Sequence, residues 1–283
     1  MAATHNRSNS IRRVLVTGGT GKTGRRVADR LLARDVQVRV GSRSAAVPFD
    51  WHDDATWLAA LDGIDAVYIA FYPDLTVPGT DALLQRFAAF AKEQGVTRLV
   101  LLSGRGEEGA QACERTVAAA GLPTTVVRAS WFMQNFSEGP FLDFVMSGTI
   151  ALPAGEALEP FIDADDIADV AVAALTEDGH AGETYELTGP TAITFADAAA
   201  ELSKATGRTI HYEDIPHDAF VDGLRDAGLP ADYVDLLDYL FTVLLDGRNS
   251  ETKDGVRRAL GREPRSFADY AREAAESWKA VTA

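Results

Sequence analysis

Two hydrophobic periods alternate along the first half of the chain. Apolar runs short enough to be strands cover residues 11–17, 36–42, 65–71, 97–103 and 124–130. Between them, apolar residues recur at helical spacing in 22–35, 53–61, 81–94 and 110–120. Strands that alternate with helices of this length predict a parallel sheet covered by helices on both faces.

The second half of the chain is less regular. Beyond Trp131 the alternation weakens, although 163–175 has the pattern of an amphipathic helix and 183–189 that of a strand returning to the sheet. From Phe195 onward helical patterns dominate. We therefore predict an α/β protein with a doubly wound parallel sheet (Rossmann): a disordered tail at 1–10, a dinucleotide-binding core at 11–130, and a region at 131–283. That last region would complete the sheet and form a smaller, mostly helical substrate lobe.

The glycine-rich stretch VTGGTGKTGRR, which begins at Val16, is compatible with two phosphate-binding devices. Gly21-Lys22-Thr23 is what a nucleotide-triphosphate P-loop needs, but that loop also needs glycine or alanine where this chain has Val16. The dinucleotide pattern fits better, because Gly18, Gly21 and Gly24 follow a strand directly and open a helix. Such glycines let the backbone approach a pyrophosphate at the helix N-terminus.

The end of the second predicted strand indicates which dinucleotide is bound. NAD enzymes place an acidic residue there for the ribose 2′-hydroxyl. This chain instead has Ser42 and Arg43, which offer a hydroxyl and a bidentate cation suited to a 2′-phosphate. The predicted cofactor is therefore NADP(H).

The composition of the chain limits the kinds of partner that it can bind. The 283-residue chain is 46% hydrophobic and carries a formal net charge of −15, so it would repel nucleic acid and anionic membranes. It has one cysteine, Cys113, which excludes intrachain disulfides, and its polar start has no apolar signal segment. We expect a cytoplasmic protein with a small-molecule substrate, with no nucleic acid or membrane partner and with homodimerisation left open.

Several motifs together resemble the NmrA-like branch of the atypical short-chain dehydrogenase/reductases. They are VLVTGGTGKTG, VGSRS, FDWHDDATW, DAVYIAFYPDL, RLVLLSG, VVRASWFMQNFSE and FIDADDIADVAVAAL. The resemblance covers nearly the whole chain. Within the branch, the motifs most resemble those of ergot-alkaloid-type (festuclavine dehydrogenase-like) reductases, which reduce a cyclic iminium with NADPH.

The resemblance implies roles for individual residues. The pyrophosphate would be held by Gly18, Thr20, Gly21, Lys22, Thr23 and Gly24, and the 2′-phosphate by Ser42 and Arg43. Asp50 and Trp51 would lie by the adenine, and Ala70, Phe71 and Tyr72 along the nicotinamide half. The nicotinamide site would be walled by Phe132, Gln134 and Asn135. Two residues depart from the motif, because Ser130 replaces its usual proline and Gln134 its usual glutamate, which leaves the shape and charge of the substrate pocket open.

The catalytic dyad of the wider superfamily is absent. Typical members have a serine at the end of a strand of the sheet, matched here by Ser103 at the end of 97–103, and a Tyr-x-x-x-Lys pair on the next helix. The stretch GRGEEGAQACERTVAAAG that follows Ser103 contains neither tyrosine nor lysine. The chain therefore lacks the tyrosine that would protonate a new alkoxide.

This absence favours some hydride acceptors over others. Ketone reduction yields an alkoxide whose conjugate acid has a pKa of ~16, so losing a positioned acid would cost about 10² to 10⁴ in rate. Quinone reduction yields a phenolate-like oxygen with a pKa of ~10, which solvent protonates readily. An iminium that accepts hydride becomes a neutral amine and needs no proton in that step. Iminium and quinone acceptors are therefore favoured over simple ketones.

Three residues are the catalytic candidates, each with a structural alternative. Ser103 could bind a substrate atom or cap the following helix. Tyr72 could donate a proton or form an aromatic wall of the cofactor site. Asn135 could contact the nicotinamide or stabilise its loop. No metal is assigned, because the histidines lack metal-ligand company and Asp163, Asp165 and Asp166 read as helix-start acids.

The sequence thus predicts an NADPH-dependent reductase that transfers hydride to a small organic acceptor without the Tyr-x-x-x-Lys dyad. The alternative is a non-catalytic NADP(H)-binding redox sensor that acts through a protein partner, since a sensor needs no acid. A sugar-nucleotide epimerase on a similar scaffold is disfavoured by the same missing dyad.

Overall fold

A computed structural model describes residues 11–279; the tail predicted at 1–10 lies outside the described residues. Contacts divide the chain into two compact units. The first contains residues up to Ser103 together with Gln111–Val127 and Ala168–Thr184. The second contains Gly104–Ala110, Arg128–Ile167 and the chain from Tyr185 onward.

The main sheet has six strands in the order β2-β1-β3-β4-β5-β7. They are β1 (Arg13–Thr17), β2 (Gln37–Gly41), β3 (Ala66–Ile69), β4 (Arg98–Gly104), β5 (Thr124–Ala129) and β7 (Thr184–Leu187). β1 pairs in parallel with both β2 and β3, and β3 pairs in parallel with β4. The predicted parallel doubly wound sheet is confirmed. Because the chain runs from β1 out to β2 and then returns to β3 on the other side, the order switches between β1 and β3.

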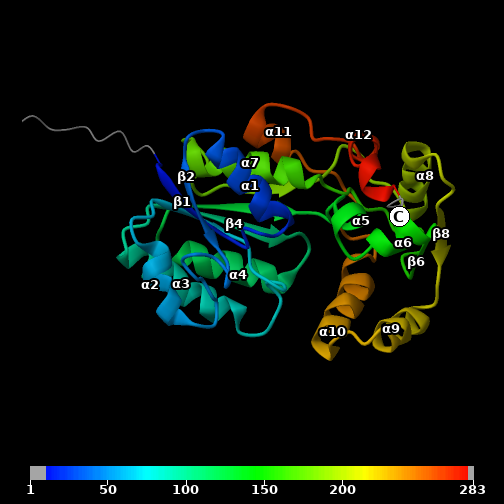
Figure 1. Ribbon diagram of the computed structural model, residues 1–283, viewed down its shortest axis with the longest axis horizontal. Coiled ribbons are helices and arrows are strands. Elements are labelled where there is room, and N and C mark those ends of the chain that lie inside the picture. Colours follow the sequence, from blue (N-terminus) through cyan, green and yellow to red (C-terminus); the bar gives the residue numbers. More distant parts are fainter. Residues whose placement is uncertain (1–10, 280–283) are drawn as a thin grey trace, which may run out of the picture. The chain divides into compact units, whose positions relative to one another are not determined.

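Helices cover both faces of this sheet, with α1 and α7 on one face and α3 and α4 on the other (Figure 1). Their bounds, with two short helical turns, are α1 (Lys22–Leu32), η1 (Asp54–Thr56), α2 (Trp57–Leu61), α3 (Thr80–Glu93), α4 (Glu108–Ala119) and α7 (Ala164–Thr176). α1 buries Val27 and Leu31 at helical spacing. Arg30 of α1 pairs with Asp169 of α7 at 2.6 Å, which ties these two helices together.

The second unit is mostly helical but contains its own small sheet. β6 (Thr149–Leu152) and β8 (His211–Asp214) form a two-stranded parallel pair that the sequence patterns did not predict. The helical segments are α5 (Asn135–Glu138), α6 (Leu142–Ser147), α8 (Phe195–Thr206), α9 (His217–Asp226), α10 (Ala231–Tyr239), η2 (Leu240–Leu244), α11 (Gly255–Leu260), α12 (Phe267–Glu273) and η3 (Ala275–Trp278).

An aromatic core holds the second unit together. Phe136, Phe161 and Phe195 are almost fully buried and lie within 6.0 Å of one another, measured between ring centroids. α8 begins with a capping box in which Thr194 and Asp197 satisfy each other's backbone amides. Within residues 11–279, no helix is long and apolar enough to cross a membrane.

Candidate functional site

The glycine loop after β1 approaches the end of β3 closely. Gly18 has a φ of +60°, and a Cβ built on it would lie 3.2 Å from both the Cβ and the carbonyl oxygen of Ala70. The Gly21 amide donates to the Gly18 carbonyl at 2.8 Å and closes the turn. A residue with a side chain would strain this turn, so the loop depends on glycine.

Gly24 lets α1 pack directly on the loop. A Cβ on this residue would lie 2.2 Å from the Gly18 carbonyl oxygen, a distance that real Cβ atoms do not tolerate. α1 begins at Lys22 with no side-chain cap on its first amides. These amides at the carboxyl edge of the sheet, beside the β1/β3 switch, suit a dinucleotide pyrophosphate.

Thr17 links the two strand ends, a contact that the sequence patterns did not indicate. Its hydroxyl lies 3.0 Å from the Tyr68 carbonyl and accepts a hydrogen bond from the Ala70 amide at 2.9 Å. Thr17 is fully buried. A threonine at the end of a predicted parallel strand is the only signal that could have indicated this contact.

The remaining pyrophosphate candidates differ in exposure. Thr20 is exposed, whereas Thr23 is buried. Lys22 is half-buried, and burial lowers the pKa of its ammonium, with Arg25 and Arg26 lowering it further. A cation held near two others provides a field that favours a bound anion.

The segment after β2 holds the two predicted 2′-phosphate residues. The Ser42 hydroxyl lies 3.1 Å from the Ser44 hydroxyl, and the Ser42 carbonyl accepts from the Phe49 amide at 3.0 Å. These bonds fold the chain back in a compact turn. Arg43 is exposed at this turn, with no hydrogen bond or ion pair to any residue in 11–279.

Asp50 and Trp51 belong to an ordered aromatic corner. The Trp57 indole donates to the Asp50 carbonyl at 2.9 Å. Trp51 is buried to 9% exposure and packs against Phe49 at 4.8 Å and Phe71 at 5.4 Å. This packing places Trp51 beside a residue predicted for the nicotinamide half and gives its ring a structural role, while its contact with the adenine stays a prediction.

The two catalytic candidates of the first unit have different surroundings. Tyr72, just beyond β3, is 75% exposed. Ser103, near the end of β4, is 4% exposed, and its hydroxyl donates to Glu114 of α4 at 2.6 Å. The hydrogen of the Ser103 hydroxyl is therefore already donated to a carboxylate of the same unit.

The predicted substrate residues Phe132, Gln134 and Asn135 lie in the second unit. Gln134 is 2% exposed; its amide nitrogen donates to Asp163 at 2.9 Å and its oxygen accepts from the Ala164 amide at 2.8 Å. Phe132 and Asn135 are half-buried. Asn135 begins α5, and its carbonyl accepts from the Phe141 amide at 3.0 Å.

The acids at the start of α7 have structural partners. Asp163 accepts from the Asp165 amide at 2.7 Å, and burial raises the pKa of the Asp163 carboxyl. Asp166 is fully buried and pairs with Arg262 at 2.7 Å and Arg265 at 2.5 Å. These contacts account for the acids as a helix start and an ion-pair anchor for the segment before α12.

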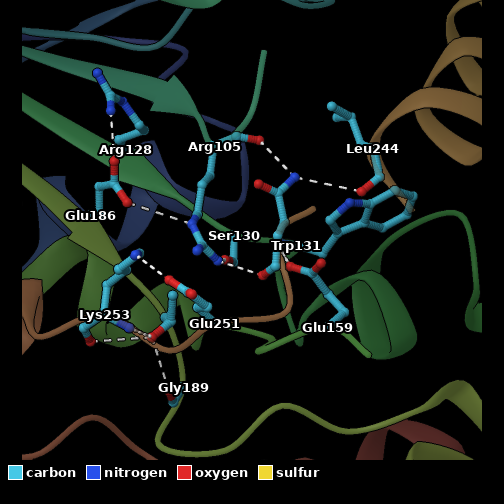
Figure 2. Close-up of polar contacts among 12 residues, drawn as sticks. Arg105, Arg128, Ser130, Trp131, Glu159, Glu186, Gly189, Leu244, Glu251 and Lys253 are labelled. Carbon is cyan, nitrogen blue, oxygen red and sulfur yellow. Dashed lines mark hydrogen bonds and ion pairs between the residues drawn. The ribbon is translucent and has the colours of Figure 1, made fainter. Parts of the chain in front are cut away.

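A buried polar network in the second unit was also not foreseen. Figure 2 shows Arg105 reaching towards Glu186 on one side and Ser130 on the other, with Glu159 below Trp131. Arg105 is 8% exposed and Glu159 is 1% exposed. Arg105, Glu159 and Glu186 lie more than twenty residues apart along the chain, so no local motif connects them.

The fold and the loop at the β1/β3 switch define an α/β dinucleotide-binding protein. Two family models match the chain, one described as the NmrA-like family over residues 110–271 and one as NAD(P)H-binding over 18–178. The chain belongs to the NmrA-like family of NAD(P)H-dependent oxidoreductases. The expected family resemblance and the dinucleotide cofactor are thereby confirmed.

Relatives and solved structures cover almost the entire chain. Prestalk A differentiation protein A of Dictyostelium discoideum is 32% identical, with 92% of this chain and 91% of that protein covered. Agroclavine dehydrogenase of Claviceps fusiformis is 32% identical, with 94% and 98% covered. The triphenylmethane reductase of Citrobacter sp., solved with NADP(H), has a TM-score of 0.75 at 20% identity, with 93% and 99% covered.

Proposed function

We propose that this protein is an NADPH-dependent reductase that transfers hydride to a cyclic iminium or a quinone in preference to a simple ketone. The observation that carries the proposal is the state of β4 and α4. α4 and the stretch before it lack a Tyr-x-x-x-Lys pair, and the Ser103 hydroxyl donates its hydrogen bond to Glu114. Acceptors that need no positioned acid are the ones that such a site can reduce.

The preference for NADPH rests on the turn after β2. Arg43 is exposed there beside Ser42, and a guanidinium binds phosphate oxygens in a bidentate manner. The name of agroclavine dehydrogenase and the NADP(H) in the triphenylmethane reductase structure support a reductase with this cofactor.

The chain's own residues would bind and orient the reactants. The glycine loop and the first amides of α1 would hold the pyrophosphate, and Lys22 with its neighbouring arginines would add positive charge. Bound NADPH supplies the hydride. Trp51, Phe71 and Tyr72 would order the cofactor, and Phe132 with Asn135 would contact the acceptor, so that catalysis comes mainly from positioning.

The test is NADPH oxidation by purified protein with cyclic iminium salts, quinones and ketones, after fluorescence titration has shown NADPH binding. Turnover of iminium or quinone acceptors, with ketones at least about 100-fold slower, is the expected outcome. Ketone turnover at a similar rate would contradict the proposal, because a ketone needs the acid that this site lacks.

A non-catalytic NADP(H) sensor is the second candidate. The likeness to a protein named for differentiation favours it, as does a β4–α4 region that would suit a protein with no proton to deliver. Tight NADPH binding without turnover of any acceptor would support the sensor. The cytoplasmic location, the lack of a nucleic-acid partner and homodimerisation stay predictions.

A further inference from the structure

The second unit contains a carboxyl group that the proposed function does not use. Glu159 is 1% exposed, and one of its oxygens accepts from the Trp131 amide at 3.3 Å. Its Oε2 atom is buried and has no hydrogen-bond partner among the described residues. Burial raises the pKa of Glu159 to about 7. An unpartnered buried oxygen is costly, so its retention needs a reason.

The Trp131 amide, the charge of Arg105 and Ser130 each lower the pKa of this carboxyl, against the larger effect of burial. Arg105 donates to the Asn249 carbonyl at 2.6 Å and lies 3.5 Å from the Ser130 hydroxyl. Ser130 directly precedes Trp131, whose amide donates to Glu159, so the backbone at Ser130 and Trp131 connects Glu159 to the Arg105 contacts (Figure 2).

Other charged groups of the network lie on the far side of Arg105. Glu186 of β7 approaches Arg105 at 3.6 Å and pairs with Arg128 of β5 at 2.7 Å. Glu251 pairs with Lys253 at 2.8 Å, and Arg105 contributes to lowering the pKa of Glu251. The charge of Arg105 thus acts on three carboxylates, those of Glu159, Glu186 and Glu251.

Glu159 begins the stretch that fixes the predicted acceptor segment. The Ile162 amide donates to the Trp131 carbonyl at 2.9 Å, and the Met133 amide donates to the Ile162 carbonyl at 2.9 Å. The Trp131 ring stacks on Phe141 at 6.0 Å and meets Phe241 at 5.3 Å. Glu159 therefore holds the backbone of the residue from which the Phe132–Asn135 segment continues.

We propose that Glu159 is a positioning residue whose charge state sets the conformation of Trp131 and of the acceptor segment after it. The ionised carboxylate attracts Arg105 and accepts a charge-assisted hydrogen bond from the Trp131 amide. The neutral acid loses that attraction and carries a proton for which its buried surroundings offer no fixed acceptor. The effect on turnover rests on the proposed function, whereas the effect on Trp131 does not.

The first experiment follows Trp131 itself. Tryptophan fluorescence of the full chain, saturated with NADP⁺, is titrated from pH 6 to 8.5, and Trp131→Phe identifies the contribution of this ring. We expect a transition with a midpoint near pH 7 that disappears in Glu159→Gln and in Trp131→Phe. Glu156→Gln, at an exposed acid in the same segment, is the matched control and should keep the transition.

Glu159→Asp is a second variant, which keeps the test informative if Glu159→Gln does not fold. It retains a carboxyl and should keep a pH transition, shifted in midpoint, whereas the amide of Glu159→Gln cannot titrate. The proposal is overturned if the unmodified protein shows no Trp131 transition, or if Glu159→Gln shows the same transition as the unmodified protein.

The second experiment measures the acceptor KM and the NADPH Kd separately. At pH 8.5, Glu159→Gln should raise the acceptor KM about tenfold, equivalent to one charged hydrogen bond, and leave the NADPH Kd unchanged. The unmodified protein at pH 6 should resemble Glu159→Gln. An unchanged KM would overturn the link to the acceptor. A protein that turns over no acceptor but shows the fluorescence transition would refute the proposed function and leave the positioning of Trp131 supported.

Discussion

The two units hold their candidate site residues by different physical means. In the first unit, backbone sterics dominate: Gly18 and Gly24 allow atoms to approach where a Cβ could not fit. In the second unit, buried polar side chains dominate, with Gln134 bonded to Asp163 and Glu159 to Trp131. Sterics are insensitive to pH, whereas a buried carboxyl is not. The comparison indicates that cofactor binding should be robust to pH and acceptor binding should not.

Adding a methyl group at Gly24 should have the largest effect. Gly24→Ala would place a Cβ 2.2 Å from the Gly18 carbonyl oxygen, so the loop or α1 must move. We expect NADPH affinity to fall by more than about 1,000-fold, or about 4 kcal/mol, by fluorescence titration.

The matched control for that variant is Gly223→Ala in α9. A Cβ at Gly223 meets nothing within 4 Å, so the change should leave NADPH binding intact. It should also stabilise α9 by about 0.5–1 kcal/mol, because alanine is the better helix former. Normal NADPH affinity in Gly24→Ala would show that backbone sterics do not form the cofactor site.

Neutralising Glu159 should stabilise the protein at high pH. The pKa of Glu159 is about 7 in the folded protein and 4.5 in the unfolded chain. Between these two pH values the carboxyl is ionised in the unfolded chain but still protonated in the folded protein, so the free energy of unfolding falls as the pH rises from about 4.5 to about 7. Relative to the unmodified protein, Glu159→Gln should gain about 3 kcal/mol at pH 8.5 and little at pH 4.5. Urea unfolding at both pH values measures this difference, and equal gains at the two pH values would contradict it.

Reversing the charge at Arg43 tests the preference for NADPH over NADH, which the steric role of the glycines in the first unit does not explain. Arg43→Glu should lower NADPH affinity about 100-fold relative to NADH, because charge-assisted bonds to the 2′-phosphate are replaced by repulsion. Arg34→Glu, at an exposed arginine just after α1, makes the same charge change and should leave the preference unaltered. Comparable affinities for both cofactors in the unmodified protein would remove Arg43 from the 2′-phosphate site.

Truncating Gln134 separates a structural residue from its more exposed neighbour. Gln134→Ala removes one of the hydrogen bonds to Asp163 and the acceptor of the Ala164 amide, and should cost about 2 kcal/mol of unfolding free energy. Asn135→Ala, at the next and half-buried position, should change stability little but lower turnover more than NADPH binding. The reverse pattern, measured by urea unfolding and steady-state kinetics, would assign the acceptor contact to Gln134.

Sequence patterns were sufficient for the parts of the molecule that local chemistry determines. The strands, helices and glycine loop of the first unit follow from apolar periodicity and from Gly18, Gly21 and Gly24. Short exposed β8 lacks such a pattern, so its pairing with β6 could not be foreseen. The network of Arg105 and Glu159 depends on partners distant along the chain. The residues next to a glutamate in the sequence do not show whether its side chain is buried.

Removing the Ser103 hydroxyl should have the smallest effect, and it tests whether the first unit contains a hidden acid. The hydroxyl donates to Glu114 at 2.6 Å, so Ser103→Ala removes a buried structural bond and no proton donor to the acceptor. We expect a loss of about 1 kcal/mol in stability and less than about a threefold change in the turnover rate with iminium or quinone acceptors. If turnover instead slowed by about two orders of magnitude, the range expected for losing a positioned acid, Ser103 would have to leave Glu114 to contact the acceptor. Catalysis would then depend on a polar side chain in the first unit as well. With turnover preserved, the first unit contributes the bound cofactor through its backbone, and selection among acceptors belongs to the second.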